Sequence, residues 1–293
     1  MLPVIGIDSG YDFTKTSEGF IIPSRISKKE KIMGKENQVI IDGALYVVGE
    51  GEIEVNINKI NTELTKACIM YSIINSTPSD DINLVLGLPI GQFKKQKDEL
   101  KEMILDNRIT DIKASTGERV LAIHDVAVFP QAAVALFDDE YYPDVIILDI
   151  GGRTIDIACF ETISGKRIMT NYSTIYEGTL SLYDKIIKAV NNELGLSLKL
   201  YDAEKILVQG LEIYGERQDV GFLKCIIEEH IDKIMNELIL NYPVQTTPVK
   251  LIGGGALLLG SPLKKRIPNL RIANNPQITN AKCFKKVGMT LWQ

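Results

Sequence analysis

Three segments of the chain share one pattern, an apolar strand that ends in a turn rich in glycine. They span residues 4–10, 145–152 and 249–255. Apolar runs of this length that are rich in β-branched residues and end at glycine predict buried strands. The glycines let backbone N–H groups approach a ligand closely, because no Cβ stands in the way. Asp8 and Asp149 end the first two strands, and carboxylates suit the hydrated magnesium that accompanies phosphates. The segments therefore predict a nucleotide cradle closed from two sides.

The first two segments also continue alike. Asp8 is followed by residues 11–16 and Asp149 by residues 154–160, so each predicts a β-hairpin with its aspartate and glycines at the tip. One such turn alone would more often be an ordinary hairpin in which the aspartate forms an Asx turn. Two matching hairpins and a triple-glycine turn after a third strand indicate two similar half-molecules that face one another.

These motifs resemble, in the same order, those of the superfamily of actin, sugar-kinase and heat-shock-chaperone ATPases. Residues 7–15 are similar to its first phosphate motif, residues 148–156 to its second, and residues 251–256 to its adenosine motif. Residues 129–134 resemble its first connecting helix, and residues 281–289 resemble the last helix, which returns to the first domain. The resemblance spans the whole chain and is best to bacterial actin-like proteins of the ParM type, which segregate plasmids.

The resemblance implies an α/β fold, the two-domain actin-like ATPase fold with ribonuclease H-like halves and the nucleotide in the interdomain cleft. Domain I is expected at residues 1–137 and 276–293, with a small inserted subdomain at about 20–80. Domain II is expected at 138–275, with a reduced small subdomain at about 195–240. A length of 293 residues suits two domains that each bury a core.

The same resemblance assigns roles around the phosphates. Asp8 and Asp149 would hold Mg²⁺ through water from opposite sides of the cleft. Lys15 matches the lysine that neutralises phosphate charge; its alternative is a strand lysine that faces solvent. The expected hydrogen-bond donors to the β- and γ-phosphates are Ser9, Gly10, Gly151, Gly152 and Thr154.

Two further residues are candidates for catalysis beside Asp149. Gln131 matches the position where actins place a glutamine that orients the attacking water. A glutamine cannot take a full proton, so it would position the water, which predicts slow hydrolysis. Asp156 is a second candidate for polarising that water. Arg153 departs from the small residue or threonine of ParM relatives, and it either reaches phosphate or points to solvent.

Recognition of the nucleoside is expected from the third glycine turn. There the backbone would approach the ribose and the α-phosphate, and the residues are Gly253, Gly254, Gly255 and Ala256. Glu177 and Gly178 are placed near the ribose, and Lys205 or Glu204 beside the adenine. The base pocket is the least marked region, so GTP stays possible beside ATP. No GxxxxGK[ST] sequence occurs, which excludes a P-loop enzyme.

Composition limits the partners and the compartment. A net charge of −5 gives little counterion release on DNA, which disfavours direct nucleic-acid binding and favours an adaptor. No apolar run approaches the roughly 20 residues of a membrane span, and the chain begins directly in a strand, so we expect no membrane partner, no signal peptide and a cytoplasmic location. His124 and His230 lack metal-ligand spacing and are expected to be structural. Four cysteines without CxxC spacing predict buried free thiols: Cys68, Cys159, Cys225 and Cys283.

The remaining pattern predicts the elements around the site. Asp42-Gly43 favours a hairpin turn within residues 39–49. The acidic, proline-containing stretch 138–143 is the expected crossing between the domains. Helices are expected at 59–74, 91–105, 131–137, 180–194, 201–209 and 222–240.

Three classes of function remain. The first is a filament-forming ATPase that assembles with copies of itself and moves plasmid DNA through a DNA-binding adaptor. The second is a small-molecule kinase of the same superfamily, which would need a second ligand site with a catalytic acid or base in the cleft. The third is a regulatory or chaperone-like ATPase. The first is favoured by the resemblance.

Overall fold

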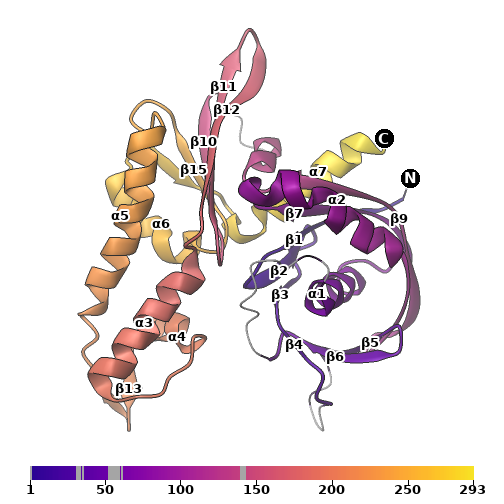
Figure 1. Ribbon diagram of the computed structural model, residues 1–293, viewed down its shortest axis with the longest axis horizontal. Helices are drawn as coiled ribbons and strands as arrows, with labels where there is room; N and C mark the ends of the chain where they lie inside the picture. The colour runs from indigo at the N-terminus through magenta and orange to yellow at the C-terminus, as the bar shows by residue number, and fades with distance from the viewer. Residues whose placement is uncertain (1, 31–33, 35, 52–59, 61, 139–142) are drawn as a thin grey trace.

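The protein folds into two α/β halves that lie side by side, each built on its own sheet (Figure 1). The computed structural model describes residues 2–30, 34, 36–51, 60, 62–138 and 143–293. The predicted crossing between the domains falls mostly on residues 139–142, outside the described part, and the domain boundaries stay predictions.

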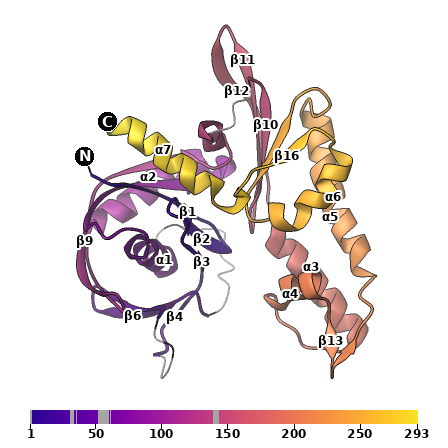
Figure 2. The ribbon, with the colours of Figure 1, turned by 180° about the vertical axis from the view of Figure 1, so that it is seen from behind.

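The first half is built on a nine-stranded sheet of order β3-β2-β1-β7-β9-β8-β5-β6-β4. Its strands are β1 (Val4–Ser9), β2 (Phe13–Thr16), β3 (Ile21–Pro23), β4 (Ile26–Ser27), β5 (Gln38–Ile41), β6 (Ala44–Val48), β7 (Asp81–Leu88), β8 (Ile109–Ala114) and β9 (Gly117–Pro130). Its helices are α1 (Glu63–Ile74), α2 (Ile90–Asp106), the 3₁₀ helix η1 (Ala133–Phe137) and the C-terminal α7 (Thr279–Leu291). The sheet curls around α1 (Figure 2), which is buried on almost every side and therefore has no polar stripe.

The second half is built on a five-stranded sheet of order β12-β11-β10-β15-β16. Its strands are β10 (Val145–Ile150), β11 (Ile155–Ile163), β12 (Lys166–Ile175), β15 (Val249–Ile252) and β16 (Leu270–Ile272), with a separate small hairpin of β13 (Glu212–Ile213) and β14 (Glu216–Arg217). Its helices are α3 (Thr179–Leu194), α4 (Asp202–Gln209), α5 (Leu223–Asn241), α6 (Ala256–Arg266) and the 3₁₀ helix η2 (Pro276–Ile278). The predicted helices after residue 180 begin and end within two residues of these bounds.

The two halves repeat one pairing scheme. β1 pairs antiparallel with β2 and parallel with β7, and β10 pairs antiparallel with β11 and parallel with β15. Asp8 lies opposite Lys15 in the first hairpin, and Asp149 lies opposite Asp156 in the second. The predicted pair of similar hairpins is confirmed, and both hairpin tips point to the junction of the halves.

The C-terminal helix returns to the first half. α7 packs against β1, β7 and η1, as both ribbon views show. Gly6 makes this approach possible, because a Cβ there would lie 2.2 Å from the backbone oxygen of Ala281 and 2.6 Å from the backbone nitrogen of Lys285. The helix end beside the site is thus held by contact between backbones.

Gly6→Ala is therefore expected to destabilise the fold by about 3 kcal/mol, because α7 must move away from β1. A chain of this size should then melt roughly 6 °C or more below the wild type. Gly254→Ala is the matched control, since its Cβ would meet nothing closer than 3.9 Å and should leave the melting temperature unchanged. Calorimetry of both variants checks this, and equal melting temperatures would mean that α7 is not seated as described.

Two sequence predictions were wrong in detail. The expected helix at 131–137 is instead a turn at 131–132 followed by η1, because Ala132 takes a left-handed conformation with φ of 58°. Cys225 is exposed, whereas the other three cysteines are buried; it lies on the outer face of α5, and its apolar neighbours Ile226 and Ile227 turn toward the core.

The two histidines differ in environment. His124 is exposed and contacts the carboxylate of Asp81 at 2.6 Å. His230 is buried, and within the described residues neither ring nitrogen has a hydrogen-bond partner. Burial lowers its pKa to about 4, so the ring is neutral near pH 7. In the part of the chain that the structure describes, no helix is both long and apolar enough to cross a membrane.

Candidate functional site

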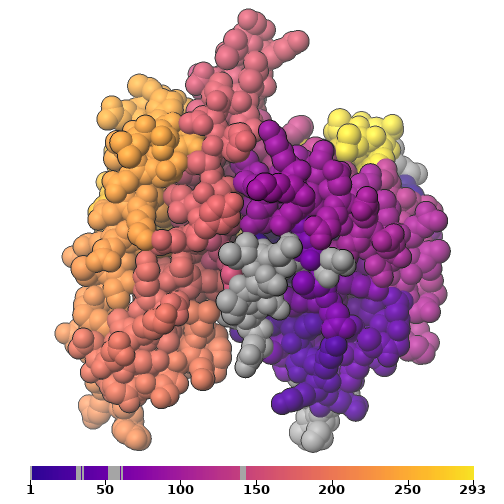
Figure 3. Space-filling model, viewed as in Figure 1, coloured from indigo at the N-terminus to yellow at the C-terminus, as the bar shows by residue number. Residues whose placement is uncertain are grey.

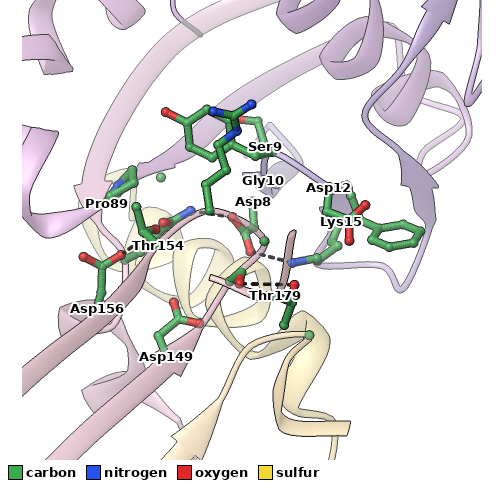
Figure 4. A pocket seen from close by; sticks show the side chains of 18 of the residues that line it. Asp8, Ser9, Gly10, Asp12, Lys15, Pro89, Asp149, Thr154, Asp156 and Thr179 are labelled. Carbon is green, nitrogen blue, oxygen red and sulfur yellow. Dashed lines mark hydrogen bonds and ion pairs between the residues drawn. The ribbon is translucent and has the colours of Figure 1, made fainter. Parts of the chain in front are cut away.

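A cavity lies where the tips of the two hairpins meet (Figure 4). About 1140 Å³ of empty space lies between its walls when the open mouth is included. A groove between the lower parts of the two halves is visible in the space-filling view (Figure 3). Both hairpins, β7 and the turns after β9 and β15 contribute to the walls.

Most of the predicted site residues line this one cavity. They are Asp8, Ser9, Gly10, Lys15, Gln131, Asp149, Gly151, Gly152, Thr154, Asp156, Gly254 and Gly255. Gly253, Ala256, Glu177, Gly178 and Lys205 are not among the lining residues, although Glu204, the neighbour of Lys205, is. The sequence analysis did not single out several others that line it, among them Tyr11, Asp12, Pro89, Gln92, Thr179, Tyr183 and Gln277.

Asp8 is held by two side chains of the first half. The Lys15 ammonium lies 3.3 Å from its Oδ2, and Nε2 of Gln131 donates to its Oδ1 at 2.6 Å. All three side chains are buried, so neither bond is shared with bulk water. The amide of Gln131 must present its nitrogen to the carboxylate, which leaves its oxygen Oε1 as an acceptor.

Asp149 has a corresponding amide partner. Nδ2 of Asn280, at the start of α7, donates to its Oδ2 at 2.7 Å. Burial raises the pKa of Asp149 to about 6, and the negative charge of Asp8 adds to the rise. Asn280 was not predicted, because no local pattern marks an asparagine that reaches a carboxylate across the molecule. The aspartate of each hairpin is thus oriented by an amide from elsewhere in the chain.

Asp156 is the least exposed of the three buried aspartates Asp8, Asp149 and Asp156. It accepts hydrogen bonds from Oγ1 of Thr174 at 2.5 Å, from Oγ1 of Thr154 at 3.3 Å and from the backbone N–H of Ile90 at 3.2 Å. Burial raises its pKa to about 7 in spite of these bonds, and the charge of Asp149 raises it further. Asp156 also joins the halves, since Ile90 begins α2 of the first half.

The cavity carries an excess of negative charge. Its acidic lining residues are Asp8, Asp12, Asp149, Asp156 and Glu204, and its basic ones are Lys15 and Arg153. Such a wall repels a bare phosphate and attracts a divalent cation, which suits Mg²⁺ with its preference for oxygen ligands. The described residues contain no group of three or more side chains able to hold a metal directly. Asp8 and Asp149 therefore fit a hydrated Mg²⁺ that is bound through its waters.

Several glycines of the three turns let segments pack closely, and of the predicted phosphate donors Gly151 has its N–H bonded within the protein. The N–H groups of Gly151, Gly253 and Gly255 donate to the backbone oxygens of Thr154, Pro276 and Ile150, so they are not available to a phosphate. Gly253 has φ of 86°, and a Cβ there would lie 2.3 Å from Asp149. Within the described residues, no protein acceptor receives the N–H of Gly152 or Gly254, which leaves these two as backbone donors to a ligand.

Glu177 and Gly178 also have other contacts than those expected. The carboxylate of Glu177 binds the Lys233 ammonium at 2.6 Å and the Lys185 ammonium at 3.3 Å. Lys233 accordingly lowers the pKa of Glu177. A Cβ at Gly178 would lie 2.5 Å from the backbone oxygens of Gly151 and Gly152. Gly178 thus lets α3 begin directly against the second hairpin. Neither Glu177 nor Gly178 lines the cavity between the hairpin tips.

The two hairpin tips touch each other. A Cβ on Gly152 would lie 2.8 Å from Cβ of Asp12, and the guanidinium of Arg153 lies 5.3 Å from the ring centroid of Tyr11, a cation–π distance. The hydroxyl of Tyr11 in turn donates to Oε1 of Gln92 at 3.4 Å. Arg153 therefore points along the cleft toward the first half, not out to solvent.

Comparison with known proteins agrees with this architecture. The N-terminal domain of actin-like proteins matches residues 6–133, and the C-terminal domain of the archaeal MreB-like actin homologue matches residues 147–265. The chain belongs to the actin-like proteins. No curated protein sequence matches it at a significant level.

Solved structures of actin-like proteins share the whole fold. A 15-stranded ParM filament from Clostridium botulinum has a TM-score of 0.87 at 23% identity and covers 99% of this chain and 100% of its own. The archaeal actin homologue Ta0583 in complex with ADP has a TM-score of 0.80 at 18% identity, over 99% and 100% of the two chains. Bacillus thuringiensis ParM with AMPPNP has a TM-score of 0.70 at 16% identity, over 100% and 99%. The predicted two-domain actin-like fold is thus confirmed.

The raised pKa of Asp156 predicts a pH dependence for this actin-like protein without ligand. Its pKa is about 7 in the folded state and about 3.9 in an unfolded chain, so the folded state binds more protons between these values. The stability that it contributes is complete below about pH 4 and is lost as the pH rises to about 7. Between about pH 5 and pH 8 the loss should be roughly 3 kcal/mol.

Urea unfolding of wild type and Asp156→Asn in the presence of EDTA measures this loss. His230 acts in the opposite direction over the same range, because its lowered pKa favours folding as the pH rises. The comparison of the two proteins cancels that contribution. We expect the wild type to lose more stability than the variant on going to high pH; equal changes would mean that Asp156 is not held protonated.

Proposed function

We propose that the chain binds ATP with Mg²⁺ in the cavity between the hairpins and hydrolyses it slowly while it assembles into filaments. The observation that carries this proposal is the pair Asp8 and Asp149. They stand on equivalent hairpins of the two halves, line one cavity and are each oriented by a buried amide. The solved structures of related fold with ADP or AMPPNP support a nucleotide as the ligand. GTP is the alternative, because little in the lining marks a particular base.

Different residues of the site are proposed to bind the metal ion and the phosphates. Asp8 and Asp149 would hold Mg²⁺ through its waters, and the bound ion would neutralise charge on the phosphates. The N–H groups of Gly152 and Gly254 and the hydroxyl of Ser9 would donate to phosphate oxygens. The Thr154 hydroxyl, which donates to Asp156, would exchange that partner for a phosphate oxygen. Lys15 is already paired with Asp8, so it reduces the local negative charge that the phosphates meet.

Gln131 is the proposed positioning group for the attacking water. Its nitrogen is fixed on Asp8, so its Oε1 can accept a hydrogen bond from the water and turn a lone pair toward the γ-phosphorus. An amide oxygen cannot remove the proton, which keeps hydrolysis slow. Asp156 lies across the cavity, and its raised pKa allows it to take or release a proton near neutral pH.

Assembly and DNA segregation are proposed from the fold. The ParM filament from Clostridium botulinum and the Alp12 filament have this fold over nearly all of the chain. The net charge of −5 disfavours direct contact with DNA, so a DNA-binding adaptor would connect such filaments to a plasmid. A cytoplasmic location fits this role.

Sedimentation of the purified protein with ATP, GTP, ADP or no nucleotide tests the proposal. A pellet that requires a triphosphate is the expected result, because only the γ-phosphate can bind both hairpins at once. A ligand shifts an equilibrium only by its difference in affinity for the two states. The protein would not be a nucleotide-driven filament if it stays in the supernatant with every nucleotide, or if it pellets equally with none.

A further inference from the structure

A second cavity adjoins the first cavity, which lies between the two hairpin tips. It contains about 1580 Å³ of empty space, including its open mouth, and reaches α3 and the segment between α3 and α4. Four residues line both cavities, namely Tyr11, Gln92, Arg153 and Thr154. The pair of Arg153 and Tyr11 therefore forms part of the wall between them. The shared wall stands at the hairpin tips, where the γ-phosphate is expected.

The second cavity has the opposite charge balance to the first. Among the residues that the structure describes, the basic ones that line it are Arg25, Arg153 and Lys199, and the acidic one is Asp184. The carboxylate of Asp184 lies 2.6 Å from the Lys188 ammonium, so its charge is partly compensated. The basic groups come from both halves, with Arg25 in the first and Lys199 in the second. An anion on this surface would bridge the cleft.

The guanidinium group of Arg25 has a hydrogen-bond donor that no described residue accepts. Its side chain is mostly buried, and its ion pair with Asp12, from Nη2 to Oδ1, is long at 3.8 Å. Its Nε is buried and lacks a hydrogen-bond partner within the described residues. A buried guanidinium nitrogen without an acceptor is costly, and a tetrahedral oxyanion offers the paired acceptors that arginine binds best.

We propose that the second cavity binds inorganic phosphate, with Arg25 as its principal ligand and Arg153 shared with the nucleotide site. A phosphate released from the acidic first cavity would pass the wall of Arg153 and Tyr11 and reach a basic surface. Arg153 lines both cavities, so it can stay in contact with the anion throughout this passage. Thr154 and Ser181 also line the second cavity, but their hydroxyls donate to Asp156 and to the backbone oxygen of Gly178, so the basic side chains supply the donors to phosphate.

This inference rests on the proposed function for the origin of the phosphate, but its test requires neither hydrolysis nor assembly. Equilibrium dialysis with radiolabelled inorganic phosphate is performed on protein saturated with ADP and Mg²⁺, and again without nucleotide. We expect the wild type to bind phosphate in both conditions. Arg25→Gln should weaken this binding at least tenfold, because hydrogen bonds between charged groups are lost. Affinity for ADP shows that the variant is folded.

Three further variants make the result specific. Asp184→Asn removes the acidic group of the cavity at a partly exposed position and should tighten phosphate binding roughly threefold. Lys224→Gln removes an exposed lysine of α5 that pairs with Glu228 and should change nothing. Lys15→Gln removes a basic side chain that lines the first cavity and not the second, so phosphate should stay on Arg25.

Several outcomes would overturn the inference. Undiminished phosphate binding by Arg25→Gln would show that this arginine is not a ligand. Loss of binding in Lys15→Gln but not in Arg25→Gln would place the phosphate only at the γ-position of the nucleotide site. If Arg25→Gln fails to fold, the Asp184→Asn variant decides. A phosphate affinity of Asp184→Asn equal to that of the wild type would contradict phosphate binding in the second cavity. Failure of the proposed function would appear separately, as absence of ATP hydrolysis in a protein that still binds phosphate.

Discussion

Replacing Asp149 with asparagine is expected to lower the rate of ATP hydrolysis by about a hundredfold or more. The carboxylate is buried, lines the same cavity as Asp8 and is oriented by Asn280. Asparagine keeps the shape but loses the charge that would hold hydrated Mg²⁺. The fold should survive, because burial already makes the charged form of Asp149 costly, as its raised pKa shows. Unfolding in EDTA should therefore find the variant at least as stable as the wild type.

Asp144→Asn is the matched control for this variant. Asp144 precedes the same strand, is exposed and accepts a hydrogen bond from the backbone N–H of Thr162. Its replacement should leave hydrolysis unchanged. A phosphate-release assay on the three proteins measures the effect, with circular dichroism as the test of folding. If Asp149→Asn hydrolyses ATP at the wild-type rate, the second hairpin has no part in the chemistry.

Gln131→Ala is expected to give filaments that persist after those of the wild type have disassembled. The variant loses the amide oxygen that positions water, so phosphate release should slow by roughly a hundredfold. ATP-dependent assembly should remain, because Gln131 is not proposed to bind the nucleotide. Asp8 loses one hydrogen bond but keeps its ion pair with Lys15.

Light scattering and phosphate release recorded on one sample test this second variant. Gln245→Ala, in the exposed segment after α5, is the control and should match the wild type in both signals. Filaments of Gln131→Ala that disappear on the wild-type schedule would remove the coupling role of this glutamine. Slow release without any change in filament lifetime would separate hydrolysis from disassembly and lead to the same conclusion.

The local pattern of the chain was sufficient for the two hairpins and their aspartates. Alternation of apolar strands with glycine turns is a property of neighbouring residues, and it located Asp8 and Asp149 correctly in one cavity. The repeat of that pattern indicated two halves because the first hairpin of each half pairs its strands in the same way. The returning helix α7 followed from the resemblance alone.

Partners that come from distant segments could not be predicted in this way. Asn280 meets Asp149 only because α7 crosses to β1, and Gln131 meets Asp8 because it lies in the turn directly after β9, where a helix was expected to begin. The N–H groups of Gly151, Gly253 and Gly255 are used inside the protein, which no glycine pattern reveals. Arg153 left two alternatives open in the sequence, and the ring of Tyr11 that it contacts comes from the other half.

The central claim is that hydrolysis in this cavity is coupled to assembly of the chain into filaments. The rate of ATP hydrolysis per subunit, measured across protein concentrations with light scattering on the same samples, tests it most directly. A neighbouring subunit that stabilises the closed cleft should accelerate hydrolysis, so the rate per subunit is predicted to rise at the concentration where scattering begins. A rate per subunit that stays constant through that concentration would contradict the claim.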